Sequence, residues 1–223
     1  MTTRVTLISP AISTALREAR FGGRVPGDSG VPDDTGDNGD NGDTDELDPA
    51  GLRQAEAVRE TFPRAAALYV SPSRRCRRTA EVLGLDASPL ADLAPCAMGR
   101  WQGRTLDEVA AAEPQSVSAW LSDPASAPHG GESIRALHAR VGHWLDALTT
   151  RPSTAGQAPD NPGGRVIAVA EPDVIRAATV HALGAGPEAF WRVDVRPLSA
   201  TELSGRNGRW NLLSGRPLHT GPH

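Results

Sequence analysis

The chain has 223 residues, 39% of them hydrophobic, and a formal net charge of -4, which suits one globular domain with a buried core. This modest charge argues against nucleic-acid binding, and no stretch of about 18 apolar residues predicts a membrane span. The two cysteines lack metal-ligand spacing, so neither a zinc set nor a disulfide framework is indicated. With no signal-peptide pattern at the amino terminus, we expect a cytoplasmic protein.

Charge is unevenly distributed along the chain. Nine acidic residues and no basic ones lie from Asp28 to Asp48, around Asp-Asn-Gly repeats. So few apolar side chains cannot offset the entropy of ordering, and we predict a disordered acidic loop at about residues 26–46. The repeats do not supply the EF-hand spacing, so no metal site is predicted. This loop interrupts a single domain over residues 1–217, and residues 218–223 are expected to form a loose tail.

Three short apolar runs predict buried strands, each followed by helical spacing: Val5–Ile8, Ala67–Val70 and Val166–Val169. Alternation of strands and helices favours a parallel sheet with helices on both faces. The predicted fold is therefore a three-layer α/β/α sandwich with a mostly parallel central sheet, in which these runs are adjacent. Sheets of this kind place their ligand sites beyond the carboxyl ends of the strands.

Capping patterns predict two helix starts. Asp48 is expected to cap a helix whose first turn holds Pro49, and Thr105 is expected to form a capping box with Glu108. In chain order, the pattern predicts a first helix that ends near residues 20–21. Further helices are predicted over 47–62, over 72–84, after 105, over 114–121, over 134–148 and over 172–184. The pattern also predicts a loop over 151–164 and two or three short strands with a turn at 207–208.

Several stretches, in order along the chain, resemble the motifs of the histidine phosphatase superfamily, the phosphoglycerate-mutase-like proteins. The most specific is Ser71–Ala80, which matches the family's S-P-L-x-R-A-x-x-T-A at Ser, Pro, Arg, Thr and Ala. The resemblance implies a phosphoglycerate-mutase-like fold, and it implies that Arg75 stands where the family clamps phosphoryl oxygens. Other matched residues are Leu7, Arg20, Phe21, Gly23, Leu47, Gly51, Gln54, Ala55, Gly99, Trp101, Gly103, Gly130–Ser133, Val174, Ile175, Arg176 and Gly184.

The resemblance ends at the positions that carry the family's chemistry. Where the family has an arginine, the nucleophilic histidine, a proton-donating glutamate and a second histidine, this chain has Ser9, Pro10, Pro95 and Glu171. Proline has no nucleophilic side chain, and a carboxylate repels an anionic phosphate. No catalytic residue of the family mechanism is therefore predicted.

Two interpretations of function follow. The first is a degenerate histidine phosphatase-like protein that acts as a ligand-binding or interaction module. The alternative is an enzyme of the phosphatase family with rewired acid–base chemistry. It would act on a phosphorylated or other anionic metabolite and would resemble a phosphomonoester hydrolase. No cofactor is expected, a small anionic metabolite is the expected ligand, and a protein partner or homodimer is left open. The expected pocket residues are Ser9, Ser13, Arg20, Arg75, Glu171, Asp173 and His129.

The family register makes one geometric prediction. Arg75 and Glu171 follow neighbouring strands, and each would be a poorly compensated charge in a cleft without the other. We therefore predict an ion pair in which Glu171 occupies the space of a bound anion. The alternative is that Arg75 turns to solvent and Glu171 pairs with Arg176 or with water.

Overall fold

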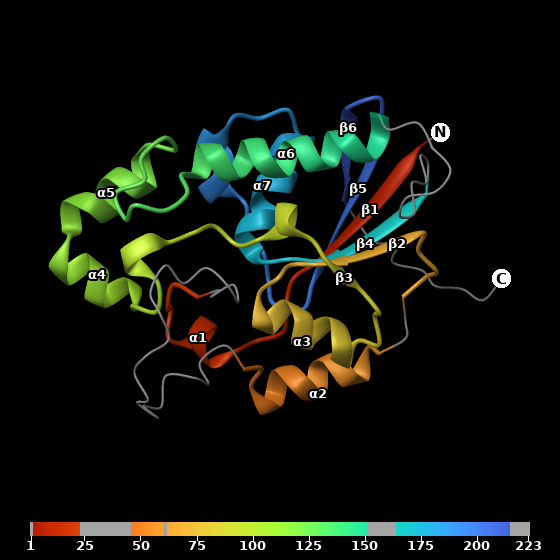
Figure 1. Ribbon diagram of the computed structural model, residues 1–223, viewed down its shortest axis with the longest axis horizontal. Coiled ribbons are helices and arrows are strands. Elements are labelled where there is room, and N and C mark those ends of the chain that lie inside the picture. Colours follow the sequence, from red (N-terminus) through yellow and green to blue (C-terminus); the bar gives the residue numbers. More distant parts are fainter. Residues whose placement is uncertain (1, 23–45, 60–61, 151–163, 215–223) are drawn as a thin grey trace.

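The computed structural model describes residues 2–22, 46–59, 62–150 and 164–214 (Figure 1). The predicted tail and nearly all of the predicted acidic loop and of the 151–164 loop lie outside these ranges, and the single-domain boundaries stay a prediction. The strands are β1 (Thr3–Ile8), β2 (Ala67–Val70), β3 (Ser88–Pro89), β4 (Arg165–Val169), β5 (Ala200–Arg206) and β6 (Arg209–Leu213). The α-helices are α1 (Thr14–Arg17), α2 (Pro49–Ala57), α3 (Arg74–Val82), α4 (Leu106–Ala112), α5 (Pro114–Ser122), α6 (Ile134–Thr150) and α7 (Pro172–Ala182), with short 3₁₀ turns η1 (Ala91–Leu93), η2 (Gly99–Trp101) and η3 (Pro187–Arg192).

The six strands form one sheet in the order β3-β2-β4-β1-β5-β6. Val166 of β4 pairs with Val5 of β1 on one side and with Ala67 of β2 on the other, both in parallel. Strand β3 also runs parallel to β2, whereas β5 and β6 are antiparallel additions at the other edge. The predicted adjacency of the three apolar runs at the centre of a mostly parallel sheet is confirmed.

Helices cover both faces of this sheet, which confirms the three-layer arrangement. Figure 1 shows α6 and α7 on one face, α2 and α3 on the other, and α4 and α5 beyond one end. Alternation along β1 divides its side chains between the two layers: Leu7 joins the core under α6 and α7, and Ile8 joins the core under α2 and α3. In β4, Ala168 and Ile167 are divided between the same two cores.

Both predicted helix caps are present. Asp48 Oδ1 accepts the Gly51 N–H at 2.7 Å at the start of α2. At the start of α4, Thr105 Oγ1 accepts the Glu108 N–H at 3.2 Å, and a Glu108 carboxylate oxygen accepts the Thr105 N–H at 2.8 Å. These contacts satisfy N–H groups that have no partner within the first turn of a helix.

The expected first helix is much shorter than predicted. Helix α1 ends at Arg17, because Ala19 adopts a left-handed φ of 49° and Arg20 then forms a β-bridge with Thr105. Phe21 packs against Trp101, with ring centroids 5.6 Å apart. Pairing with a distant segment therefore overrides the local helical spacing. Helix α2 also ends early, at Ala57, whereas α6 continues to Thr150.

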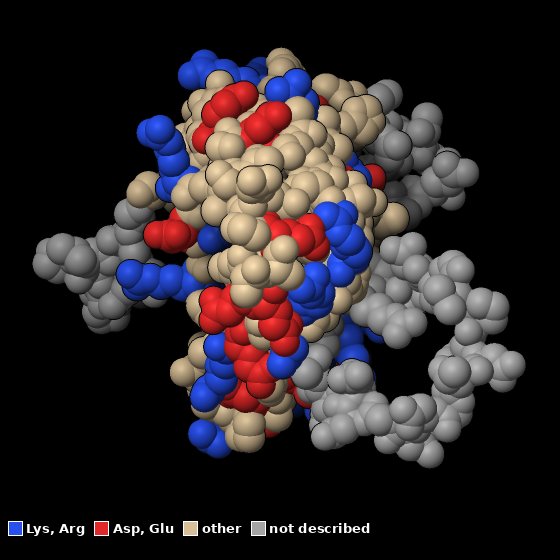
Figure 2. All heavy atoms as spheres, turned by 90° about the vertical axis from the view of Figure 1, so that its left-hand side faces the viewer, with Lys and Arg blue, Asp and Glu red and all other residues tan. Residues whose placement is uncertain are grey.

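Charges on the α4–α5 end are largely paired. Figure 2 looks onto this end and shows acidic and basic side chains side by side. Glu113 receives Arg100 at 2.5 Å and Arg104 at 3.6 Å. Within the described ranges, no helix is both long and apolar enough to cross a membrane.

Candidate functional site

The carboxyl ends of β1, β2 and β4 meet at one edge of the sheet. Val169, the last residue of β4, pairs with Ile8 of β1 and with Val70 of β2, each the last residue of its strand. The residues that follow these strands are buried and polar: Ser9 after β1, Ser71 after β2 and, one residue further on, Glu171 after β4. This edge is where open parallel sheets hold their ligands.

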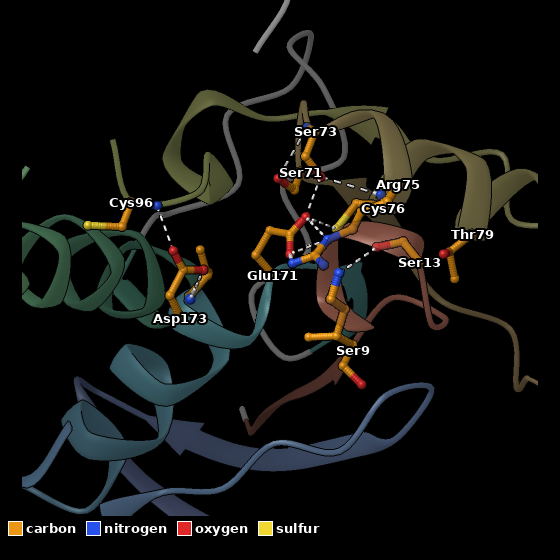
Figure 3. A network of polar contacts seen from close by, with 12 residues as sticks. Ser9, Ser13, Ser71, Ser73, Arg75, Cys76, Thr79, Cys96, Glu171 and Asp173 are labelled. Carbon is orange, nitrogen blue, oxygen red and sulfur yellow. Dashed lines mark hydrogen bonds and ion pairs between the residues drawn. The ribbon is translucent and has the colours of Figure 1, made fainter. Parts of the chain in front are cut away.

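Glu171 and Arg75 form a buried ion pair at this edge (Figure 3). Arg75 Nε donates to both carboxylate oxygens of Glu171 at 2.8 Å, and its Nη2 donates to Oε2. The side chain of Glu171 is 2% exposed and that of Arg75 is 11% exposed. The predicted ion pair is confirmed.

Two further side chains of α3 turn toward the same carboxylate. Ser73 Oγ donates to Glu171 Oε1 at 2.7 Å, and the Cys76 thiol lies 3.5 Å from that oxygen. Ser73 is also the N-cap of α3, since its Oγ accepts the Cys76 N–H at 3.3 Å. The first turn of α3 therefore holds the carboxylate much as it would hold an external anion.

The local sequence sets the direction of the Glu171 side chain. Pro172 fixes the start of α7, and Glu171 precedes it in extended conformation with φ of -63° and ψ of 153°. Its side chain makes no capping bond to α7 and points across to α3 instead. Asp173, in the first turn of α7, accepts the Val174 N–H at 2.8 Å and the Cys96 N–H at 2.6 Å.

The pKa values of the Glu171 and Asp173 carboxyl groups are shifted in opposite directions. Burial acts to raise the pKa of Glu171, but the Arg75 guanidinium and the hydrogen bonds from Arg75 and Ser73 outweigh it, so its pKa lies below the ordinary value. Burial and the nearby charge of Glu171 raise the pKa of Asp173 above its ordinary value. Burial, followed by the charge of Glu171, also raises the pKa of Cys76, so this thiol stays protonated and is not activated as a nucleophile.

The other residues expected in the pocket make their contacts elsewhere. Ser9 is fully buried, donates to the Arg196 carbonyl at 2.5 Å and accepts the Ser199 N–H at 2.9 Å, which ties the end of β1 to the segment before β5. Ser13 caps α1 by accepting the Leu16 N–H at 3.4 Å.

Arg20 and His129 contact the segments around Trp101. Arg20 donates to the Gly103 carbonyl at 3.1 Å and pairs with Glu18. His129 is 1% exposed, its ring lies 5.1 Å from that of Trp101, and its Nδ1 accepts the Gly131 N–H. Burial, with the nearby Arg100 charge, lowers the pKa of His129.

Pro10 and Pro95 are both buried, and they lie in two different segments of the chain. Pro10 is buried directly after Ser9. Pro95 is buried directly before Cys96, whose N–H binds Asp173, so the Pro95 segment reaches the Asp173 side of the cluster. The contacts therefore join Arg75 and Glu171 beyond the strand ends, and Asp173 lies close enough for the charge of Glu171 to raise its pKa. Among the described residues, no group of three or more His, Cys, Asp and Glu side chains is placed to hold a metal ion.

Sequence reasoning missed Ser73 and Cys76. Ser73 follows a proline at the start of a predicted helix, which is an N-cap signal. That signal predicts the bond to its own helix but not the bond to Glu171, 98 positions away.

Comparisons with known proteins agree with this fold. Residues 35–216 match the model of the histidine phosphatase superfamily (branch 1). The chain is 36% identical to a glucosyl-3-phosphoglycerate phosphatase of Mycolicibacterium vanbaalenii, over 76% of this chain and 73% of that protein. It is 33% identical to a glucosyl-3-phosphoglycerate phosphatase of Mycobacterium tuberculosis, over 76% and 74% of the two chains.

Solved structures show the same architecture. A mycobacterial glucosyl-3-phosphoglycerate phosphatase superposes with a TM-score of 0.70 at 25% identity, over 95% of this chain and 97% of that one. A phosphoserine phosphatase variant from Entamoeba histolytica shares the fold, with a TM-score of 0.72 at 20% identity and 95% coverage of both chains. The fold is the phosphoglycerate-mutase-like α/β fold. The chain belongs to the histidine phosphatase superfamily.

Proposed function

We propose that this chain is a superfamily member that binds a small ligand at the strand-end site and does not use phosphohistidine chemistry. In this proposal Ser9, Pro10, Pro95 and Glu171 occupy the family's arginine, histidine, acid and second histidine positions. The support is the position of these residues in the fold. Ser9 and Pro10 directly follow β1, and Glu171 follows β4 with only Ala170 between them.

The observation that carries the proposal is the ion pair between Glu171 and Arg75. A phosphate needs the guanidinium fork, and Glu171 already accepts both its Nε and Nη2 donors. Ser73 donates to the same carboxylate. An incoming phosphate would have to displace a covalently tethered anion whose effective concentration is high.

The described histidines do not replace the missing nucleophile. His129 lies in the aromatic cluster around Trp101, and His138, His143 and His181 lie on α6 and α7. His181 Nε2 lies 3.1 Å from Asp146 Oδ1, away from the Glu171 cluster. Glu171 instead has its hydrogen bonds to Arg75 and Ser73.

A second candidate is a phosphomonoester hydrolase with rewired acid–base chemistry, and two observations favour it. The relatives are named glucosyl-3-phosphoglycerate phosphatases. In addition, the pKa values of Glu171 and Asp173 are moved in opposite directions, an arrangement that suits one ionised carboxylate and one proton donor. A small phosphorylated metabolite is the ligand class for this second candidate. Cytoplasmic localisation and a protein partner stay predictions.

A phosphatase assay with matched variants tests the proposal. The substrates are a phosphomonoester panel that includes glucosyl-3-phosphoglycerate and phosphoserine, with Asp173→Asn and Arg75→Gln variants beside the unmodified protein. We expect no turnover above buffer and no acid-labile phosphoenzyme. Turnover that both variants abolish would establish the second candidate, and a trapped phosphohistidine would overturn both.

A further inference from the structure

A polar hollow lies on the sheet face at the edge opposite to β3. It has a volume of about 520 Å³ and is formed by the β5–β6 hairpin together with the residue that precedes β1. The hollow is open to solvent. The residues around it are Thr2, Ser204, Gly205, Arg206, Asn207, Arg209 and Asn211.

Strand register places four arginines on this one face. Opposite residues in paired strands share a face, and so do residues two apart in one strand. Arg4 pairs with Arg165 of β4 on one side and with Ser204 of β5 on the other, and Ser204 pairs with Asn211 of β6. Two positions toward the hairpin turn, Arg206 pairs with Arg209.

The opposite face of the β5–β6 hairpin is hydrogen-bonded to α6. Trp210 is buried, packs over Gly205 and donates its indole N–H to Asp146 at 3.1 Å. At the turn, the Gly208 N–H donates to Thr149 Oγ1 at 2.8 Å. The hairpin therefore presents its arginines outward from a backbone that is already held, which lowers the entropy cost of binding.

Among the described residues, these arginines have no acidic partners. Within residues 2–22, 46–59, 62–150 and 164–214, none of Arg4, Arg165, Arg206 and Arg209 forms an ion pair. This differs from the paired charges of the α4–α5 end in Figure 2. Glu202 is an acidic residue on the same face. It lies two positions before Ser204 on β5, farther from the hairpin turn, and it does not line the hollow.

We propose that this face is a binding site for a small molecule that carries several linked phosphate groups. Guanidinium forks match phosphate oxygens bidentately, and the hydroxyl of Ser204 and the amides of Asn207 and Asn211 add neutral donors. Ser204 and Asn211 of the row line the hollow, and Arg4 and Arg165 lie on the same face beyond it. The whole row from β4 to β6 crosses three inter-strand spacings, about 14 Å, which exceeds the width of one phosphate and suits a chain of them. This site is separate from the Arg75–Glu171 site, so either proposal stands without the other.

Calorimetric titration with tripolyphosphate tests this site, with orthophosphate as the short comparison. We expect saturable binding of tripolyphosphate that weakens with salt, and much weaker binding of orthophosphate. The Arg206→Gln/Arg209→Gln variant should lose about tenfold or more in affinity, since hydrogen bonds to charged groups are removed. Both side chains are exposed, so its thermal midpoint should be unchanged.

The matched control is Arg53→Gln/Arg77→Gln, which removes two exposed arginines from α2 and α3 and changes net charge equally. Its affinity should stay within about twofold of the unmodified protein. An equal loss in both double variants, or no saturable binding, would overturn the proposal. Tighter binding of a single-stranded RNA oligomer or of phosphoinositide vesicles would assign the face to those partners instead.

Discussion

Ser73 Oγ serves two partners at once: it accepts the Cys76 N–H at 3.3 Å and donates to Glu171 Oε1 at 2.7 Å. Ser73 thereby caps α3 and fixes the carboxylate that follows β4. The start of one helix and the start of another, α7, are joined through a single buried hydroxyl.

Replacing Ser73 with alanine should destabilise the protein by about 2 to 4 kcal/mol, since the change removes both an N-cap and a bond to a buried carboxylate. Urea unfolding measures the loss. Ser133→Ala is the control, because Ser133 Oγ accepts the Ala136 N–H at 3.2 Å at the start of α6 and, among the described residues, bonds to no carboxylate. A loss no larger than that of Ser133→Ala would contradict the shared role of Ser73.

Arg75 should be strongly coupled to Glu171. Arg75→Met leaves a buried carboxylate without its main partner and should cost about 3 to 5 kcal/mol. The double variant Arg75→Met/Glu171→Gln removes the charge as well, so it should be more stable than Arg75→Met alone. A double-mutant cycle of unfolding free energies measures the coupling. Simple additivity of the two single changes would refute it.

Stability should depend on pH through both carboxyl groups, with opposite signs. The pKa of Glu171 is lowered from 4.5, so its ion pair stabilises the protein above about pH 4.5 and this stabilisation is lost as the pH falls through the folded value. The pKa of Asp173 is raised from 3.8, so its contribution is present below pH 3.8 and is lost as the pH rises through its folded value.

Unfolding free energies between pH 3 and pH 8 separate these contributions. Glu171→Gln should flatten the acid limb of the profile, and Asp173→Asn should remove the loss that accompanies rising pH. The matched control is Asp92→Asn, an exposed residue near the same segment, which should leave both limbs unchanged. Identical profiles for Asp173→Asn and the unmodified protein would disprove the Asp173 contribution.

Orthophosphate should bind the strand-end site weakly, and Glu171→Gln should strengthen that binding. Removing one charge about 4 Å from the anion relieves up to about 4 kcal/mol of repulsion at an effective dielectric near 20, so a gain of tenfold or more is expected. Phosphate titration followed by NMR measures it, with a change of the exposed Glu202 of β5, Glu202→Gln, as a charge-matched control. Micromolar phosphate binding by the unmodified protein would end the idea that Glu171 fills the anion position.

Features set by short-range patterns could be predicted from the sequence. The central strands followed from apolar runs, and the caps at Asp48 and Thr105 followed from residue types at fixed offsets. The Arg75–Glu171 pair could be predicted because a family register placed two residues after neighbouring strands.

Features set by distant contacts could not be predicted. The early end of α1 depends on the bridge between Arg20 and Thr105, and no local pattern near Arg20 encodes it. The role of Ser9 depends on carbonyl and amide groups of Arg196 and Ser199 near the other end of the chain. In the sequence, Ser9 reads as a small polar residue at a site edge, whereas its hydroxyl is used to join strands.

The bonding of Ser9 limits which residues position 9 can hold. An arginine at position 9 would not fit the fully buried space, and it would release both the Arg196 carbonyl and the Ser199 N–H from their partner. Evolution toward an arginine there would first need a compensating change in the segment that leads into β5. The residue at position 9 and the geometry of the β1–β5 junction are thus expected to change together, which makes the loss of Ser9 an epistatic step rather than a single substitution.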